Sequence, residues 1–191
     1  ADYHVGNGLV ASIAGFYGAW DAEINRRYMS GASLTGSNGD TNVQASAIRL
    51  RLDWLDVARV GKLSFSPFLA YGQIETHANA YTESTGIFAA QFEAYRQTTR
   101  DTRAGVTAAM QVATDTDLRL SAEAINQANS SGQLNASVSN VPIPIASAAH
   151  QENRARFGAE IDHRLSKQSV LNASMHFTAG SEASYVASVG W

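Results

Sequence analysis

Two pairs of polar residues in this sequence have a spacing that could support catalysis. Glu160 and Asp162 lie two residues apart, so on a β-strand they would share a face, as a general acid and base require. Three arginines would lie on that same face: Arg154, Arg156 and Arg164. Charge balance therefore explains the two carboxylates better than catalysis does. Ser174 and His176 also share a face, but no orienting third residue and no Gly-x-Ser-x-Gly elbow accompanies them, so we expect a protein that is not an enzyme.

Composition removes several further classes of site and partner. The 191 residues include no Cys, which excludes disulfide bonds, thiolate metal ligands and a Cys nucleophile. The formal net charge is -3 and basic residues are scattered among acidic ones, so we expect no nucleic-acid partner. The segment 36–40 resembles a calcium loop only loosely, because it lacks the spaced carboxylates of an EF-hand. We therefore expect no cofactor and no metal.

The elements that carry these residues are indicated by alternating apolar and polar positions. In the segment 47–54, for example, every second residue is apolar, and Arg49, Arg51 and Asp53 lie between them. A period of two is typical of a strand. Seven segments follow this pattern: residues 47–54, 63–72, 103–112, 118–124, 154–162, 171–177 and 183–191. Residues 9–22 are an eighth candidate, in which Gly15, Gly18 and aromatic residues on both faces blur the alternation. Most of them match the length of about 9 to 11 residues with which a tilted strand crosses a bilayer, or exceed it.

The two faces of these strands favour a membrane barrel over a soluble, lipocalin-like one. One face is apolar, and we expect Leu50, Leu120, Phe157 and Met175 to contact lipid. The other face is polar and would line the lumen: Arg49, Arg51, Asp53, Arg103, Glu123, Arg154, Arg156, Glu160 and Asp162. A soluble barrel would need a charged exterior, yet the chain has only two lysines. The sequence therefore predicts an all-β fold, an antiparallel up-and-down transmembrane β-barrel of the outer-membrane type with eight readable strands.

The connections between the segments alternate in length, as they do in transmembrane barrels. Short links are expected near Gly61 and at 113–117 and 164–169, on the periplasmic side. Long outer loops are expected at three places: 25–41, 74–102 and 128–152. The last outer loop, 178–182, is short but fits the same alternation.

Two further groups of side chains have structural roles in this interpretation. The lumenal charges would either form salt bridges within the barrel or contact a chain that passes through it, and both roles stay open. Four aromatic residues fall near predicted strand ends and would form interfacial girdles: Trp20, Trp54, Tyr71 and Trp191.

Three stretches of the sequence resemble the C-terminal translocator domain of autotransporters, the type V secretion family. Residues 1–10, followed by Gly15 and Gly18, look like an internal hairpin of that domain. Residues 63–71, in which Pro67 is followed by apolar and aromatic residues, look like one of its strands. The terminal segment 183–191, which ends on Trp191, is similar to the last strand of bacterial outer-membrane barrels in general.

The resemblance implies a twelve-stranded barrel whose lumen holds an N-terminal helix linked to a secreted passenger. Eight strands are readable and residues 1–4 read as the end of a ninth, so we expect residues 1–191 to be a C-terminal portion of such a domain, lacking its first strands and linker helix. The implied partners are the lipid bilayer, the protein's own passenger and linker helix, and the outer-membrane insertion machinery. Tyr185, Val189 and Trp191 would form the assembly signal, and the C-terminus would point toward the periplasm.

The predicted function is that of a translocator, which anchors an N-terminal passenger in the outer membrane and exports it to the cell surface. Two other functions stay open. A passive porin or a small surface adhesin of eight to ten strands would show the same alternation. An outer-membrane protease or phospholipase would need a carboxylate or Ser/His cluster near the outer rim, and we identify none in the sequence.

Overall fold

The computed structural model describes residues 1–84, 86–130, 132–181 and 183–191, and the regular structure of these residues is entirely β. The strands in chain order are β1 (Asp2–Gly6), β2 (Leu9–Ser30), β3 (Ser33–Trp54), β4 (Ala58–Val60), β5 (Leu63–Ala78), β6 (Tyr81–Thr82), β7 (Ala90–Phe92), β8 (Tyr95–Ala113), β9 (Thr116–Asn129), β10 (Gly132–Val138), β11 (Val141–Ser147), β12 (His150–Arg164), β13 (Val170–Ala179) and β14 (Ser184–Gly190). No helix in this part of the chain is long and apolar enough to cross a membrane.

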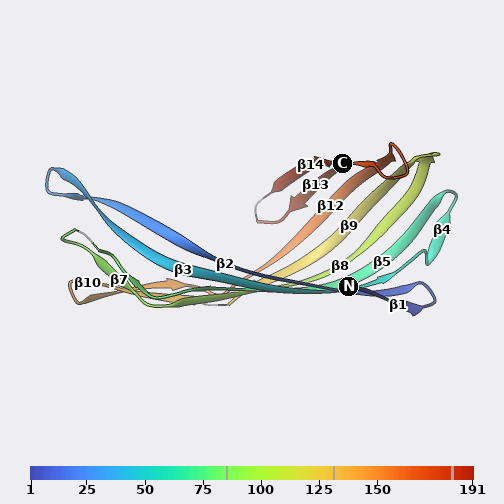
Figure 1. The fold of residues 1–191 in the computed structure, drawn as a ribbon. Coiled ribbons are helices and arrows are strands. Elements are labelled where there is room, and N and C mark those ends of the chain that lie inside the picture. The colour runs from blue at the N-terminus through green and yellow to red at the C-terminus, as the bar shows by residue number, and fades with distance from the viewer. Residues whose placement is uncertain (85, 131, 182) are drawn as a thin grey trace.

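The main sheet follows the chain order of an up-and-down meander. Its strands pair antiparallel in the order β1-β2-β3-β5-β8-β9-β12-β13-β14, and β4 pairs with β5 beside this path (Figure 1). The eight predicted segments are confirmed, because each lies largely within one of these strands. The expected ninth strand end is β1, which forms a hairpin with β2 through Asn7 and Gly8, both at positive φ. The sheet is curved, and it does not close between β1 and β14.

The three long outer loops predicted from the sequence are largely wrong. The strands β2 and β3 stay in register from the pair Leu9 and Trp54 to the pair Ser30 and Ser33, so residues 25–41 form the far end of one long hairpin. The side chains of this segment are largely polar on both faces, and the alternation that indicates a strand is therefore missing. Backbone hydrogen bonding between strands needs no such alternation, so pairing continues without it.

The other two predicted loops, 74–102 and 128–152, extend the strands of the main sheet and also fold into a second sheet. The strand order of this second sheet is β11-β10-β7-β6. The two segments, which we call the excursions, therefore pair with each other through β7 and β10. Ser139 and Asn140 link β10 to β11 with φ values of 49° and 64°, as a type I′ turn requires. Pro142 and Pro144 occupy alternate positions of the edge strand β11. Proline lacks an N–H donor, so these two residues oppose pairing of this edge strand with a strand of another chain.

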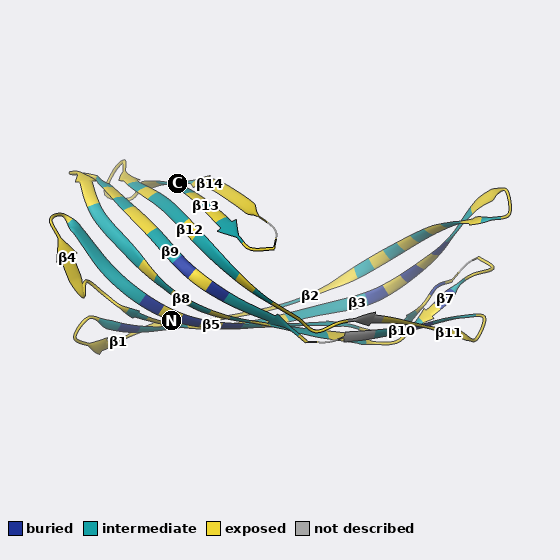
Figure 2. Ribbon diagram, turned by 180° about the vertical axis from the view of Figure 1, so that it is seen from behind, coloured by how far each residue is buried: buried dark blue, intermediate teal, exposed yellow. Residues whose placement is uncertain are grey.

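The main sheet has little buried core, and one of its faces carries large exposed apolar side chains. Leu50, Phe157 and Met175 are 45%, 52% and 60% exposed. Along residues 99–107 of β8 half-buried and exposed residues alternate, and Figure 2 shows exposed bands between half-buried ones on β9 and β12 as well. An apolar face of this extent is unusual in a soluble monomer and indicates a surface that contacts another apolar phase.

Candidate functional site

All nine charged residues that the sequence predicts for the lumen lie on a single face of the main sheet. Residues that are paired across strands share a face. Arg51, Arg103 and Arg154, for example, fall in one register row that crosses β3, β5, β8, β9 and β12. We call this side the charged face, and its predicted members are Arg49, Arg51, Asp53, Arg103, Glu123, Arg154, Arg156, Glu160 and Asp162. Four predicted lipid-contacting residues lie on the opposite, apolar face: Leu50, Leu120, Phe157 and Met175.

Glu123 is the most deeply buried member of the charged face. Its side chain is 6% exposed and its carboxylate forms an ion pair with Arg156, its direct neighbour on β12. Nη1 of Arg103 lies 3.8 Å from Oε1 of Glu123, and Nε of Arg103 donates to Asp101. A carboxylate removed from water is stable only when cations or donors compensate it. The alternating charges of β8, β9 and β12 supply that compensation.

A second ion pair lies on β3 within the same face. Arg51 donates from Nε and Nη2 to the two carboxylate oxygens of Asp53, both at 2.7 Å. The guanidinium carbon lies 3.8 Å from the ring centroid of Phe68, which is buried on β5. This geometry combines a bidentate ion pair with a cation–π contact, so it fixes the guanidinium against the wall of the sheet.

Glu160 and Asp162, the candidate catalytic pair, are held in a charge-compensated cluster. Nη1 of Arg119 donates to Oε2 of Glu160 at 3.0 Å, and Nη2 of Arg119 lies 4.0 Å from Asp162. The side-chain amide of Asn172 donates to Glu160 at 2.9 Å and to Asp162 at 2.7 Å. Both carboxylates are therefore hydrogen-bonded and lie beside a cation. The cluster fits a structural or docking role better than proton transfer.

The remaining predicted arginines are less well paired. Nε of Arg154 lies 3.5 Å from a carboxylate oxygen of Glu152. Arg49 is exposed, and within the described residues it has no carboxylate within 4.0 Å. It faces Gly72 across the strand pair, and Gly72 in turn faces Asp101. Arg49 is therefore a charge of this face that is available to a partner.

The predicted Ser and His pair is not assembled as a nucleophile and base. The hydroxyl of Ser174 lies 2.8 Å from the hydroxyl of Ser188, on the neighbouring strand β14. His176 instead leans over Gly158, where an added Cβ would lie 2.5 Å from Nδ1 of the histidine and 2.5 Å from Oγ of Ser121. Within the described residues, no group of three or more His, Asp or Glu could hold a metal ion.

The sequence analysis did not name several residues of these clusters as site residues: Phe68, Asp101, Arg119, Glu152 and Asn172. The period-two pattern contains the signal for four of them. Three lie an even number of positions from a predicted charged residue on the same strand: Asp101, Arg119 and Glu152. The fourth, Asn172, pairs directly with Asp162. Phe68 could not be found in this way, because an aromatic residue on a charged face breaks the pattern.

Glycines on the charged face allow neighbouring side chains to lie flat against the sheet. At Gly105, an added Cβ would lie 2.6 Å from the backbone oxygen of Ala122 and 2.8 Å from Cβ of Glu123. We expect Gly105→Ala to destabilise the folded domain by about 1 to 3 kcal/mol, the usual cost of overpacking. Urea unfolding in lipid vesicles, followed by tryptophan fluorescence, would measure this. Gly15→Ala is the control, because its nearest neighbour would lie at an ordinary 3.7 Å. Equal losses for both variants would contradict this account.

An ion pair joins the long hairpin to the excursion between β5 and β8. Arg26 on β2 donates to both carboxylate oxygens of Glu83, from Nε at 2.9 Å and from Nη2 at 2.6 Å. Nη2 also donates to the backbone oxygen of Phe88, and Glu83 accepts the backbone N–H of Ala90 at 2.8 Å. The side chain of Glu83 is fully buried. We call this contact the outer latch.

The outer latch should resist mild acid. Hydrogen bonds from Arg26 lower the pKa of Glu83 from 4.5 to about 2. A lowered folded-state pKa gives stability that is fully present above pH 4.5 and is lost as pH falls toward 2. We expect the distance between nitroxide labels at Ser30 and Gln91, measured by pulsed electron resonance, to stay fixed at pH 5 and to broaden near pH 2. Glu83→Gln should broaden it at both pH values. A wild-type distance that already changes at pH 5 would show that the ion pair does not hold the hairpin.

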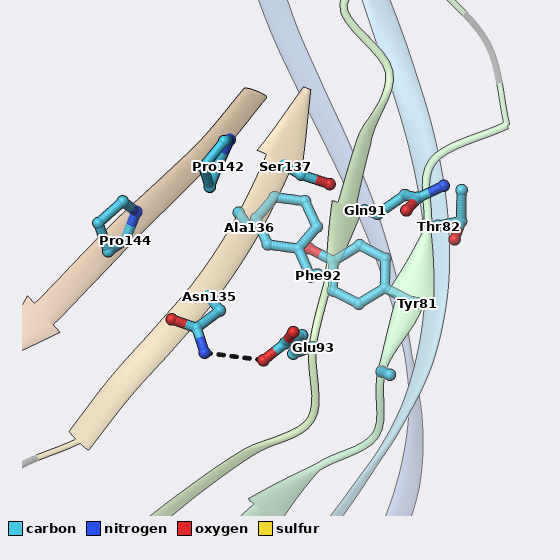
Figure 3. Close-up of a pocket in the computed structure, with 11 residues that line it drawn as sticks. Tyr81, Thr82, Gln91, Phe92, Glu93, Asn135, Ala136, Ser137, Pro142 and Pro144 are labelled. Atoms are coloured by element: carbon cyan, nitrogen blue, oxygen red, sulfur yellow. Dashed lines mark hydrogen bonds between the residues drawn. The ribbon is translucent and has the colours of Figure 1, made fainter. Parts of the chain in front are cut away.

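The second sheet also carries a hollow of about 820 Å³, away from the charged face. Its polar wall includes Gln91, Glu93 and Asn135, and Pro142 and Pro144 border it (Figure 3). The side-chain amide of Asn135 donates to Glu93 at 2.7 Å. This bond ties β10 to the end of β7 and so stabilises the join between the two excursions.

An antiparallel up-and-down sheet with one charged face and one apolar face is the hallmark of the outer-membrane β-barrel class. The chain belongs to the autotransporter beta-domain family, whose pattern matches residues 1–176. This membership assigns the domain to an outer membrane and to type V secretion. Among curated proteins, none matches this chain.

The chain is similar to several solved structures. The ferric yersiniabactin uptake receptor FyuA from Yersinia pestis superposes with a TM-score of 0.52 at 10% identity, and the match covers 98% of this chain but 30% of the receptor. The translocator domain of the autotransporter NalP from Neisseria meningitidis gives a TM-score of 0.47 at 14% identity, with 98% and 69% covered. The beta domain of the Bordetella autotransporter BrkA gives 0.46 at 12% identity, with 98% and 77% covered.

The aromatic residues of the predicted girdles are only partly where the sequence places them. Trp54 and Tyr71 lie on the apolar face, and Trp54 ends β3, whereas Tyr71 lies in the middle of β5 and not near a strand end. The prediction is wrong for Trp20, which lies in the middle of β2 and on the charged face, because β2 continues to Ser30. Tyr185 and Val189 of the predicted assembly signal lie on the apolar face, whereas Trp191 follows the end of β14 and is 97% exposed. The last predicted outer loop, 178–182, includes Glu182, which lies outside the described residues.

Proposed function

We propose that this domain anchors an N-terminal passenger in the outer membrane and exports it to the cell surface. The observation that carries the proposal is the match of the autotransporter beta-domain family to residues 1–176. In this proposal the apolar face contacts lipid and the charged face lines a lumen. The C-terminus points toward the periplasm, and the long hairpin and the second sheet project outward.

The charged face supports a lumen that holds a polypeptide. Its charges are of both signs and most are paired within the face, so a passing segment meets a polar wall without strong net attraction. Arg49 lacks a carboxylate partner among the described residues and would bind an acidic side chain or a backbone oxygen of the linker helix. A wall of this kind favours passage over tight retention, as export requires.

The export experiment expresses the full-length protein, with an epitope tag in its passenger, in a Gram-negative host. External protease should digest the passenger on intact cells while the barrel band stays heat-modifiable. A barrel that assembles fully but leaves the passenger protected inside the cell would contradict the export proposal. The small porin or adhesin would then replace it.

Assembly offers a separate prediction. We expect deletion of Trp191 to lower the amount of inserted, heat-modifiable barrel several-fold, because the insertion machinery would recognise the terminal strand. The backbone N–H and C=O groups of that strand must also be hydrogen-bonded within the lipid. Deletion of Trp191 removes no residue of the charged face, so the barrel that does insert should export normally. Substitution of Trp191 by Phe, which keeps an aromatic end, is the matched control. Unchanged surface levels after the deletion, at low expression, would contradict the assembly role.

A further inference from the structure

The apolar face contains a hollow of about 730 Å³ that crosses β1, β2, β3 and β5 and reaches Thr102 on β8. It lies above Ala11, which shares a register row with Tyr3 on β1 and Leu52 on β3. The larger side chains around it form the walls: Tyr3, Ile13, Leu50, Leu52, Leu69 and Tyr71. One small residue among large neighbours therefore leaves a depression in the surface that lipid would contact.

A cation lies beyond one wall of this hollow, since Arg100 is two positions before the lining residue Thr102 on β8. On β5, Tyr71 is followed two positions later on the same face by Gln73, and Gln73 pairs with Arg100 on β8. The hydroxyl of Tyr71 donates to Oε1 of Gln73 at 3.1 Å, and Nε of Arg100 donates to the same oxygen at 3.3 Å. The apolar surface thus ends at a polar group that holds the arginine in place.

The guanidinium of Arg100 is available to an anion. Arg100 is exposed, and within the described residues no carboxylate lies within 4.0 Å of it. The nearest charged pair on the same face is Arg96 with Glu75, whose closest atoms are 3.6 Å apart and whose arginine side chain is 65% exposed. The local charge at this border is therefore positive. Arginine with free terminal N–H groups binds phosphate oxygens well, because its planar fork matches their geometry.

We propose that the hollow and Arg100 together bind one phosphate-bearing lipid of the membrane, with an acyl chain in the hollow and the phosphate on the guanidinium. An apolar depression in a membrane-facing wall is filled by hydrocarbon because water there is costly. A cation at the polar border then selects lipids with an anionic headgroup. The inference rests on the apolar face being in the bilayer, and it does not depend on passenger export.

The test measures lipid binding to the full-length protein, folded in detergent, by native mass spectrometry. The probes are phosphatidylglycerol and diacylglycerol with the same acyl chains, which differ only in the phosphoglycerol headgroup. We expect the wild-type protein to bind phosphatidylglycerol at least tenfold more tightly than diacylglycerol. Arg100→Gln should remove most of that preference, and Ala11→Phe, which fills the hollow, should weaken binding of both lipids.

Two matched variants control for general effects of substitution. Arg164→Gln changes an exposed arginine at the other end of the strands, and Ala124→Phe adds the same ring to an exposed apolar-face alanine on β9 that does not line the hollow. Both should bind lipid as the wild type does, and all variants are compared only as heat-modifiable, folded protein. Equal losses for Arg100→Gln and Arg164→Gln, or equal affinity of the wild type for the two lipids, would overturn the proposal. Displacement of phosphatidylglycerol by millimolar inorganic phosphate would assign the site to free phosphate and overturn it as well.

Discussion

Phe157→Arg should lower the stability of the membrane-inserted domain by about 2 to 4 kcal/mol, the cost of an arginine near the bilayer midplane on a lipid-facing strand. Phe157 is 52% exposed and pairs with Phe177 on β13 and Ala122 on β9, so the charge would replace an aromatic ring at the centre of the apolar face. The expected result is a several-fold loss of heat-modifiable barrel in outer membranes and a lower urea midpoint in lipid vesicles.

The control for this change is an arginine on the other face of a neighbouring strand. Ser174 lies on the charged face opposite Glu160, so Ser174→Arg places the new charge beside a carboxylate. It should cost far less than Phe157→Arg. Nitroxide labels give an independent measurement. If labels at Leu50 and Phe157 were accessible to water-soluble reagents while labels at Arg49 and Arg156 were shielded, the assignment of the two faces would be reversed.

Glu123→Leu should destabilise the domain by about 3 kcal/mol, because it leaves two arginines without their shared carboxylate. The side chain of Glu123 is 6% exposed, whereas those of Arg156 and Arg103 are 33% and 22% exposed. Arg103 retains Asp101, so most of the loss falls on Arg156. Urea unfolding in lipid vesicles would measure the change in free energy.

A double-mutant cycle separates the ion pair from other effects of the substitution. Removing both partners, as Glu123→Leu with Arg156→Leu, should restore part of the lost stability, because no charge is then left buried without a partner. Glu75→Leu is the control, since Glu75 and Arg96 form an exposed pair worth less than about 1 kcal/mol. A loss for Glu123→Leu no greater than that for Glu75→Leu would contradict a structural role of the buried pair.

The sequence alone was enough to predict the strands of the main sheet and their two faces. In each of the eight segments, side chains of one kind recur every second residue, and a strand must place such residues on one side. Antiparallel pairing of successive strands then places all polar rows on the same face of the sheet. Arg51 and Arg154 are more than a hundred residues apart and still lie in one register row. The resemblance to autotransporter translocators rested on the same short patterns and agrees with the family assignment.

The hairpin of β2 and β3 beyond residue 25 and the second sheet could not be predicted from the sequence and are seen only in the tertiary structure. Their polar segments carry no period, and strand formation there follows from backbone pairing with a neighbour whose identity the sequence does not reveal. The outer latch is an example, because Arg26 and Glu83 lie 57 positions apart and no local pattern connects them.

Which charges of the charged face form ion pairs with each other was also decided by the tertiary structure. The alternation places Glu123 and Arg156 on the same face, but only the register of β9 against β12 makes them direct neighbours. A shift of that register by two residues would keep every side chain on its face and change every ion pair. The period of the sequence therefore determined on which face of the sheet each residue lies. The register between strands decided which charges form ion pairs, because an ion pair needs contact within a few ångströms whereas a face extends along a whole strand.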